Sequence, residues 1–288
     1  MSENGNSILD EYKMFRFTDT DRKQILSAIK NKYVNVASSP KEHFRYPTGQ
    51  DGLEYLKYDV ELLEEFPDQA ISLFCGVGNP LIIGNIELGS KVLDVGCGAG
   101  LETLLVARMV GLEGHATGID ISAEMLKQAK ENQIECKIPN ATFIDSTAED
   151  LPFPSDSFDL IISNGVINMV VDKIGALAEI IRVLKPGGRL QMADQLLVGQ
   201  MPSEVEAMVK DWDDCGGGAV PGKMFLTMLK EAGFERAKLL GRTDFDSSPV
   251  TMGTIIRGFK PDSELKSNEK LSIDTKKDEL SPQSGCSP

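Results

Sequence analysis

A glycine-rich segment places the tightest limit on the fold of this chain. Residues 92–100 read VLDVGCGAG, an apolar run that leads into three alternating glycines. The residues that follow, Leu101, Leu104 and Leu105, have the spacing of one helix face. Glycine permits a tight turn and lets the backbone approach a ligand closely. The segment therefore predicts a buried strand, a ligand-binding turn and a helix, although an ordinary strand-to-helix turn is an alternative.

The residues around the glycines indicate the kind of ligand. Dinucleotide-binding loops have the spacing G-x-G-x-x-G, whereas here the third glycine comes one residue early and Leu101 takes the dinucleotide position. Asp94 would repel a phosphate but suits a cationic ammonium group, which favours S-adenosylmethionine. Asp120 follows the loop by about twenty residues, at the end of the next predicted strand, where a carboxylate can bind both ribose hydroxyls.

Short apolar runs alternate with helical patterns from Lys91 onward, which predicts a parallel sheet with helices on both faces. Two further strand-like runs follow the last helix without a helix between them, so we expect a hairpin with an antiparallel strand at the sheet edge. The expected fold is α/β and Rossmann-like, with a mostly parallel seven-stranded sheet. The predicted strands are Lys91–Val95, His115–Ile121, Ala141–Ser146, Phe158–Ser163, Arg189–Ala193, Ala237–Leu240 and Thr251–Phe259.

Capping residues mark two of the helices between these strands. Asp172 is expected to cap a helix with apolar residues from Leu177 to Leu184 at i, i+3, i+4 and i+7, which residues 186–188 (PGG) would end. Ser122 is expected to cap the helix that carries Met125.

Composition divides the chain into three parts. Residues 1–86 are mixed and polar, with predicted helices at Asp21–Lys32 and Glu61–Phe74, and we interpret them as an N-terminal extension that caps the next domain. Residues 87–261 form the expected cofactor-binding domain. Residues 262–288 are rich in Ser, Lys, Asp and Glu and nearly lack large apolar residues, which predicts a disordered tail.

Charge and cysteine content argue against several classes of protein. The net charge is -14 and no dense Lys/Arg cluster is present, which disfavours a nucleic-acid partner. No apolar run approaches the length of a membrane span, and the N-terminus lacks a signal core. Five irregularly spaced cysteines argue against a disulfide scaffold and favour the cytoplasm. Two scattered histidines, His43 and His115, are too few for a His-based metal site, so we expect no metal.

Several segments together resemble the class I S-adenosylmethionine-dependent methyltransferases, from about Leu81 to Lys260. Residues 92–100 resemble the first motif of that superfamily and residues 118–120 the second, while residues 147–153 (TAEDLPF) are similar to the adenine-flanking segment of ubiquinone-type enzymes. Residues 158–164 (FDLIISN) resemble the fourth strand, and residues 182–188 (RVLKPGG) resemble the turn before the fifth. The resemblance implies that Thr147 and Ala148 bound the adenine and that Asn164 lines the methyl-bearing end; for Thr147 and Ala148 a plain loop is the alternative.

Other segments resemble the arsenite methyltransferases, which hold trivalent arsenic by cysteine thiolates. The similar segments are residues 58–63, 74–80, 163–168, 172–173 and 215–219. The chain departs from the family at two of its three cysteines, because Val77 and Gly165 take their places and only Cys215 matches. Cys75, two positions from the first, is a possible substitute. The predicted ligand set for As(III) is therefore incomplete.

We expect an enzyme that transfers a methyl group in line to a small molecule. The alternatives are a thiol-dependent arsenite methyltransferase with a reduced cysteine set and a cofactor-binding protein without catalysis. The sequence identifies no catalytic acid or base, no acceptor atom and no oligomeric state. The candidate substrate residues are Cys75, Asn79 and Cys215. The candidate cofactor-binding residues are Asp94, Gly96, Cys97, Gly98, Gly100, Asp120, Ile121, Thr147, Ala148, Glu149 and Asn164.

Overall fold

The computed structural model describes residue 12, residues 15–210, residue 212 and residues 217–262. Cys215 and all of the predicted tail except Asp262 lie outside these residues.

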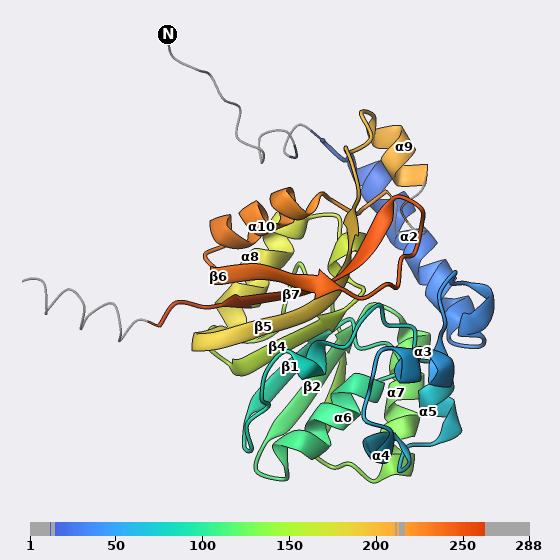
Figure 1. Cartoon of the computed structure of the whole chain (residues 1–288), viewed down its shortest axis with the longest axis vertical. Coiled ribbons are helices and arrows are strands. Elements are labelled where there is room, and N and C mark those ends of the chain that lie inside the picture. Colours follow the sequence, from blue (N-terminus) through green and yellow to red (C-terminus); the bar gives the residue numbers. More distant parts are fainter. Residues whose placement is uncertain (1–11, 13–14, 211, 213–216, 263–288) are drawn as a thin grey trace, which may run out of the picture.

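Within the described residues, seven strands form one sheet (Figure 1). Their order across the sheet is β3-β2-β1-β4-β5-β7-β6. The first five strands run parallel, and β7 is antiparallel to both β5 and β6. The mostly parallel α/β fold is therefore confirmed. The strands are β1 (Lys91–Val95), β2 (His115–Asp120), β3 (Ala141–Asp145), β4 (Phe158–Asn164), β5 (Leu184–Leu197), β6 (Glu235–Arg242) and β7 (Thr251–Phe259).

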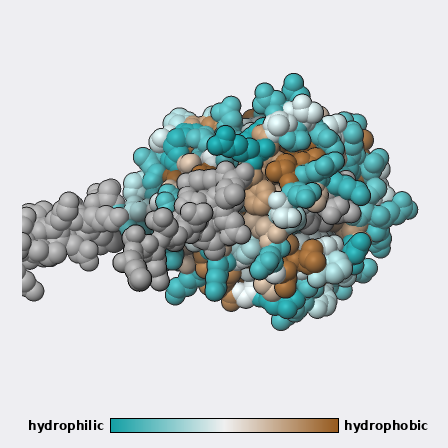
Figure 2. Space-filling model, turned by 90° about the horizontal axis from the view of Figure 1, so that it is seen from above, coloured by the Kyte–Doolittle hydropathy of each residue, from teal (hydrophilic) through white to brown (hydrophobic). Residues whose placement is uncertain are grey.

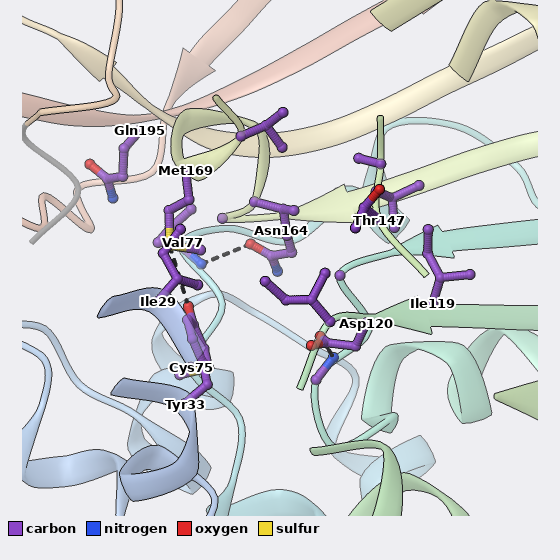
Figure 3. A pocket seen from close by; sticks show the side chains of 18 of the residues that line it. Ile29, Tyr33, Cys75, Val77, Ile119, Asp120, Thr147, Asn164, Met169 and Gln195 are labelled. Atoms are coloured by element: carbon purple, nitrogen blue, oxygen red, sulfur yellow. Dashed lines mark hydrogen bonds between the residues drawn. The ribbon is translucent and has the colours of Figure 1, made fainter. Parts of the chain in front are cut away.

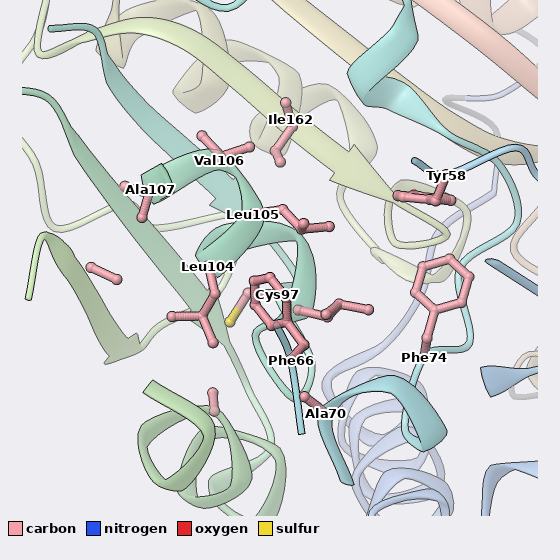
Figure 4. Close-up of a cluster of buried hydrophobic side chains, with 14 of the residues drawn as sticks. Tyr58, Phe66, Ala70, Phe74, Cys97, Leu104, Leu105, Val106, Ala107 and Ile162 are labelled. Atoms are coloured by element: carbon pink, nitrogen blue, oxygen red, sulfur yellow. The ribbon is translucent and has the colours of Figure 1, made fainter. Parts of the chain in front are cut away.

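Helices cover both faces of the sheet, and each face has its own core. On one side α6 and α7 contact β1, β2 and β3, and on the other α8 and α10 contact β5 and β6. Successive residues of β4 point into opposite cores, because Ile162 packs with Leu104 and Leu105 of α6 (Figure 4) while Ile161 packs with Leu177 of α8. From β1 onward the helices are α6 (Leu101–Val110), α7 (Ala123–Cys136), α8 (Lys173–Val183), α9 (Val205–Lys210) and α10 (Gly222–Glu231), with the 3₁₀ turn η3 (Ile167–Met169).

Both predicted caps are present. The Ser122 hydroxyl accepts the Met125 N–H at 3.3 Å, and the Asp172 carboxylate accepts the Gly175 N–H at 2.9 Å. As predicted, α8 ends before residues 186–188: it stops at Val183, and these residues form the first, irregular part of β5. β5 is much longer than predicted because β7 pairs with it as far as Leu197. The local signal of the glycines is retained at the start of the strand, where Gly187 has a φ of 76°.

The segment before β1 consists of short helices. Its predicted second helix, Glu61–Phe74, is wrong, because Pro67 separates two shorter helices and disfavours a helical conformation for the residue before it. Its first helix extends beyond the prediction at both ends, and a capping box between Thr18 and Asp21 fixes its start. The elements are α2 (Asp19–Val36), η1 (Pro40–Glu42), α3 (Gly49–Tyr55), α4 (Val60–Leu63), α5 (Asp68–Ser72) and η2 (Pro80–Ile82).

These N-terminal elements lie together along one side of the molecule (Figure 1). α2 contacts α7 and α9, and α5 contacts α7. Tyr58 and Phe74 pack into the same core as α6, as Figure 4 shows. The segment therefore shares a core with the sheet domain instead of forming a separate unit.

The view of the surface in Figure 2 is mostly hydrophilic, with hydrophobic residues in a few separate places. The most exposed large apolar residues, Leu88, Leu112, Ile134 and Ile82, belong to different elements or loops. Among the described helices, none combines the length and the apolar character needed to cross a membrane.

Candidate active site

The glycine loop makes the turn from β1 to α6. Gly96 and Gly98 have φ angles of 76° and 52°, which side chains of L residues rarely adopt. A Cβ at Gly96 would lie 2.2 Å from a methyl carbon of Val166, whereas a Cβ at Gly98 would meet no atom within 4 Å. The first glycine thus allows close packing against the residues after β4, and the second leaves the backbone open to a ligand.

Asp120 ends β2 and faces the glycine loop. Its carboxylate accepts the N–H groups of Gly98 and Ser122, both at 2.9 Å. These bonds hold the carboxylate beside the loop and help to keep it charged, although its burial raises the pKa above the usual range for aspartate. The arrangement leaves the other lone pairs of the carboxylate for hydroxyl donors of a ligand.

A pocket opens where the strand order reverses between β1 and β4 (Figure 3). It contains about 1010 Å³ of space outside protein atoms, part of which is open to solvent. In Figure 3, Asp120 and Thr147 lie at one end, Met169 and Tyr33 lie at the other, and Asn164 lies between them. The candidate residues that line the pocket are Cys75, Gly96, Gly98, Asp120, Ile121, Thr147, Ala148, Glu149 and Asn164.

Four other candidates lie away from the pocket wall. Asp94 is buried below the loop, where it accepts the Thr103 hydroxyl at 2.6 Å, and its burial raises its pKa. Cys97 is buried against Gly118, and burial raises the pKa of its thiol too. Gly100 is the N-cap residue of α6. The Asn79 side chain caps η2 and donates to the carbonyls of residues 56 and 57, which is a structural role.

A partly buried polar network, which the sequence did not predict, connects the N-terminal segment to α6. The Tyr58 hydroxyl donates to the Glu102 carboxylate at 2.6 Å, and the Asn164 amide donates to the same carboxylate at 3.1 Å. The amide oxygen of Asn164 accepts the Val77 N–H at 2.8 Å, and its N–H₂ group donates to the Gly78 carbonyl at 2.8 Å. Asn164 thus ties the end of β4 to residues 77 and 78.

The far end of the pocket is mostly apolar, and the N-terminal segment supplies much of it. Leu26, Ile29 and Tyr33 come from α2, and Phe44 and Tyr46 come from the loop that follows. The sequence suggests Tyr46 as a wall of an apolar pocket, with core packing as the alternative, but it gives no signal for the residues of α2, since their helical spacing is that of any amphipathic helix. Only the position of α2 across the pocket distinguishes them.

Polar groups at this end already have partners in the protein. The Tyr46 hydroxyl donates to the Cys75 carbonyl at 3.0 Å, and the Tyr33 hydroxyl lies 3.8 Å from the Met169 sulfur. The Gln195 amide donates to the Phe245 carbonyl. Among the described lining residues the charged side chains are Asp120, which ends β2, and Glu149, which follows β3, and none is Lys, Arg or His.

Comparison with known proteins places this geometry in a family. The model of the family described as "Methyltransferase domain" matches residues 86–233, more than half of the chain. The chain belongs to this family. An arsenite methyltransferase from Halobacterium salinarum is 34% identical over 192 residues, which cover 67% of this chain and 49% of the relative. Another from Mus musculus is 30% identical over 223 residues, which cover 74% of this chain and 59% of the relative. The chain thus spans about half the length of these relatives.

A solved structure agrees with this assignment. CrArsM, an arsenic (III) S-adenosylmethionine methyltransferase from Chlamydomonas reinhardtii, is 28% identical and aligns with a TM-score of 0.55. The alignment covers 76% of this chain and 75% of that chain. The chain therefore belongs to a methyltransferase domain family and has arsenite methyltransferases among its relatives.

The pocket fits the cofactor that the family implies. Gly98 offers a bare backbone, and Asp120 offers an oriented carboxylate for the ribose hydroxyls. The described lining residues include no basic side chain for a pyrophosphate. The donor set therefore suits S-adenosylmethionine better than a dinucleotide.

Proposed function

We propose that this methyltransferase transfers a methyl group, by in-line displacement, to a small molecule held at the apolar end of the pocket. The supporting observation is that a single pocket joins the Asp120 end to an apolar end, with Asn164 between them. When bound, S-adenosylmethionine supplies a methyl group activated by the positive charge on its sulfur. The arsenite methyltransferases among the relatives support a small acceptor as well.

We assign the cofactor to the glycine-loop end of the pocket. Asp120 would bind the ribose hydroxyls, and Thr147 and Ala148 would bound the adenine. Gly96 and Gly98 would let the backbone approach the amino-acid end. Asp94 would act from below the loop through its charge, because it is buried there and does not line the pocket.

The remaining residues align the acceptor and exclude water. The aromatic rings of Tyr33, Phe44 and Tyr46 and the side chain of Met169 line the acceptor end. Their contribution is proximity, orientation and desolvation, which can account for much of the rate of a transfer from an activated methyl group. No described side chain at this end is a carboxylate or an imidazole that could remove a proton. The site therefore favours a weakly polar acceptor that is nucleophilic without a protein base.

Arsenite is a second candidate acceptor, supported by the relatives and by the position of Cys75 in the pocket. Two observations weigh against it. A Cβ at Gly165 would lie 3.5 Å from a methyl group of Val77, so the two positions are neighbours in the pocket, and neither of them supplies a thiolate. Gly165 also has a φ of 74°, which disfavours any side chain there.

Methyl transfer can be tested without knowing the acceptor. Purified protein is incubated with S-adenosylmethionine labelled in its methyl group and with a whole cell extract. We expect label in a molecule of low mass and none in protein or nucleic acid. Label that enters only macromolecules would contradict a small-molecule acceptor, and absence of label would contradict the proposed activity.

The arsenite alternative requires its own assay. Turnover of arsenite with excess glutathione is measured for the parent, Cys75→Ser and Cys215→Ser, with Cys136→Ser at the end of α7 as control. We expect weak turnover or none, because two thiolates leave As(III) open to competing thiols. Efficient turnover that both substitutions abolish, and the control does not, would show that a two-cysteine site suffices. Turnover indifferent to both would indicate methylation of arsenic–glutathione adducts.

A further inference from the structure

The acceptor end of the pocket depends on a short turn after β4. Met169, within η3, and Val170, which follows it, both line the pocket. A 3₁₀ turn of three residues has few hydrogen bonds of its own, so side chains elsewhere must satisfy most of its backbone groups.

Lys173 supplies two of these contacts. It is the first residue of α8 and its relative exposure is 1%, although lysine is seldom buried. Its ammonium group donates to the carbonyls of Asn168 at 2.9 Å and Val170 at 2.6 Å. The Trp212 ring lies 5.0 Å from the same nitrogen, and its indole N–H donates to the intervening Met169 carbonyl at 2.8 Å. Three successive carbonyls of the turn are therefore held by these two side chains.

Asp194 holds the opposite side of the turn. It lies on β5 with a relative exposure of 1%. Its carboxylate accepts the N–H groups of Ile167 at 2.8 Å and of Asn168 at 3.3 Å. The turn thus lies between a buried cation, which donates to its carbonyls, and a buried anion, which accepts from its N–H groups.

We propose that Lys173 is a positioning residue, which together with Asp194 holds the turn so that Met169 and Val170 form the acceptor side of the pocket. This inference rests on the proposed function only in assigning the acceptor to that side. Burying a charge is costly, and an apolar residue of similar length would stabilise a helix start at least as well. The cost of burying Lys173 and Asp194 beside η3 is explained if the two side chains hold the turn in a conformation that its own hydrogen bonds do not stabilise.

The charge on Lys173 can change near neutral pH. Burial lowers the pKa of its ammonium group to about 7, and the described acidic groups that face it, Asp194, Glu149 and Asp172, oppose this shift. The pKa of Asp194 is itself raised by burial to about 6. Removing the negative charge of Asp194 should therefore lower the pKa of Lys173 further.

Trp212 provides a signal that needs no acceptor, since it is the only tryptophan in the sequence and contacts both the turn and Lys173. Its fluorescence is measured as the pH is raised in the parent, in Lys173→Met and in Asp194→Asn. We expect a titration in the parent with a midpoint of about 7, which is absent in Lys173→Met. In Asp194→Asn the midpoint should move down by about one pH unit. Lys223→Met, at an exposed lysine near the start of α10, is the matched control and should match the parent.

Function is measured on the same variants. Lys173→Met should bind S-adenosylhomocysteine within about twofold of the parent, because Asp120 and the glycine loop belong to other elements. Its methyl transfer to the acceptor found in the extract assay should fall by about tenfold to a hundredfold. Lys173→Arg, which keeps a charged donor throughout, should lose the titration and retain more transfer than Lys173→Met.

Two results would overturn the proposal. One is a titration of Trp212 that persists in Lys173→Met with its midpoint unchanged. The other is equal loss of cofactor binding and methyl transfer, which would mean that Lys173 supports the whole fold. Should Lys173→Met fail to fold, the Trp212 titration in Asp194→Asn provides the test. A lowered midpoint supports the proposal, and an unchanged midpoint contradicts it. If the extract assay finds no acceptor, the proposed function fails while the fluorescence test of Lys173 still stands.

Discussion

Asp120 is the single residue whose replacement most directly tests the cofactor site. Its carboxylate is held by the N–H groups of Gly98 and Ser122 and faces the pocket. We expect Asp120→Ala to weaken the binding of both S-adenosylmethionine and S-adenosylhomocysteine by roughly 1–3 kcal/mol, because the ribose hydroxyls and the two N–H groups would lose their acceptor. Isothermal titration calorimetry measures both affinities.

Asp145 offers a matched control, since it ends the neighbouring strand β3 but is exposed and does not line the pocket. Asp145→Ala should bind both nucleotides like the parent. Unchanged affinity in Asp120→Ala, or equal losses in the two variants, would contradict the assignment of Asp120 to the ribose. Absence of binding to the parent protein would contradict the cofactor site as a whole.

At the scale of elements, the start of α6 carries a partly buried carboxyl group that joins three parts of the fold. Glu102 of α6 accepts from Tyr58 of the N-terminal segment and from Asn164 of β4. Burial raises the pKa of Glu102, and the nearby charge of Asp94 raises it further. A carboxyl with a raised pKa binds more protons in the folded than in the unfolded protein, so its contribution to stability is lost as the pH rises through that pKa.

Glu102→Gln should reduce this loss, because the amide resembles the protonated carboxyl group at every pH. We expect the melting temperature of the parent to fall from about pH 5 to about pH 8, and that of Glu102→Gln to fall less. Differential scanning calorimetry at several pH values gives both profiles. Glu113→Gln, at an exposed glutamate before β2, should follow the parent. Parallel profiles for the parent and Glu102→Gln would refute the link between this carboxyl and stability.

For the whole molecule, the described fold reaches Asp262, and the residues beyond it offer little to a core. Residues 263–288 contain many Ser, Lys, Asp and Glu residues and hardly any large apolar ones. Deleting them should leave the melting temperature and the cofactor affinity nearly unchanged, since almost no apolar surface would be lost. Thermal denaturation and calorimetry on the shortened chain check this. A fall of several degrees would mean that the segment docks on the domain.

The glycine loop and the strand pattern were readable from the sequence because their signals are local. Turn glycines, capping residues and apolar runs depend on neighbours within a few residues, and they predicted β1, β7 and the caps Ser122 and Asp172. The same signals predicted too short a β5, because pairing with the distant strand β7 extends it to Leu197. Pro67 was a local signal that the apolar pattern of residues 61–74 concealed.

The contents of the pocket depend on contacts between distant residues. By itself the sequence determined the methyltransferase fold and the loop-end residues Gly98 and Asp120, since a tight turn and a strand end each restrict nearby residue types. Only the tertiary structure placed α2 across the acceptor end and brought Lys173 and Asp194 to the same turn. A buried lysine has no periodicity that distinguishes it from an exposed one, because its environment is created by β5 and Trp212 and not by its neighbours in the chain.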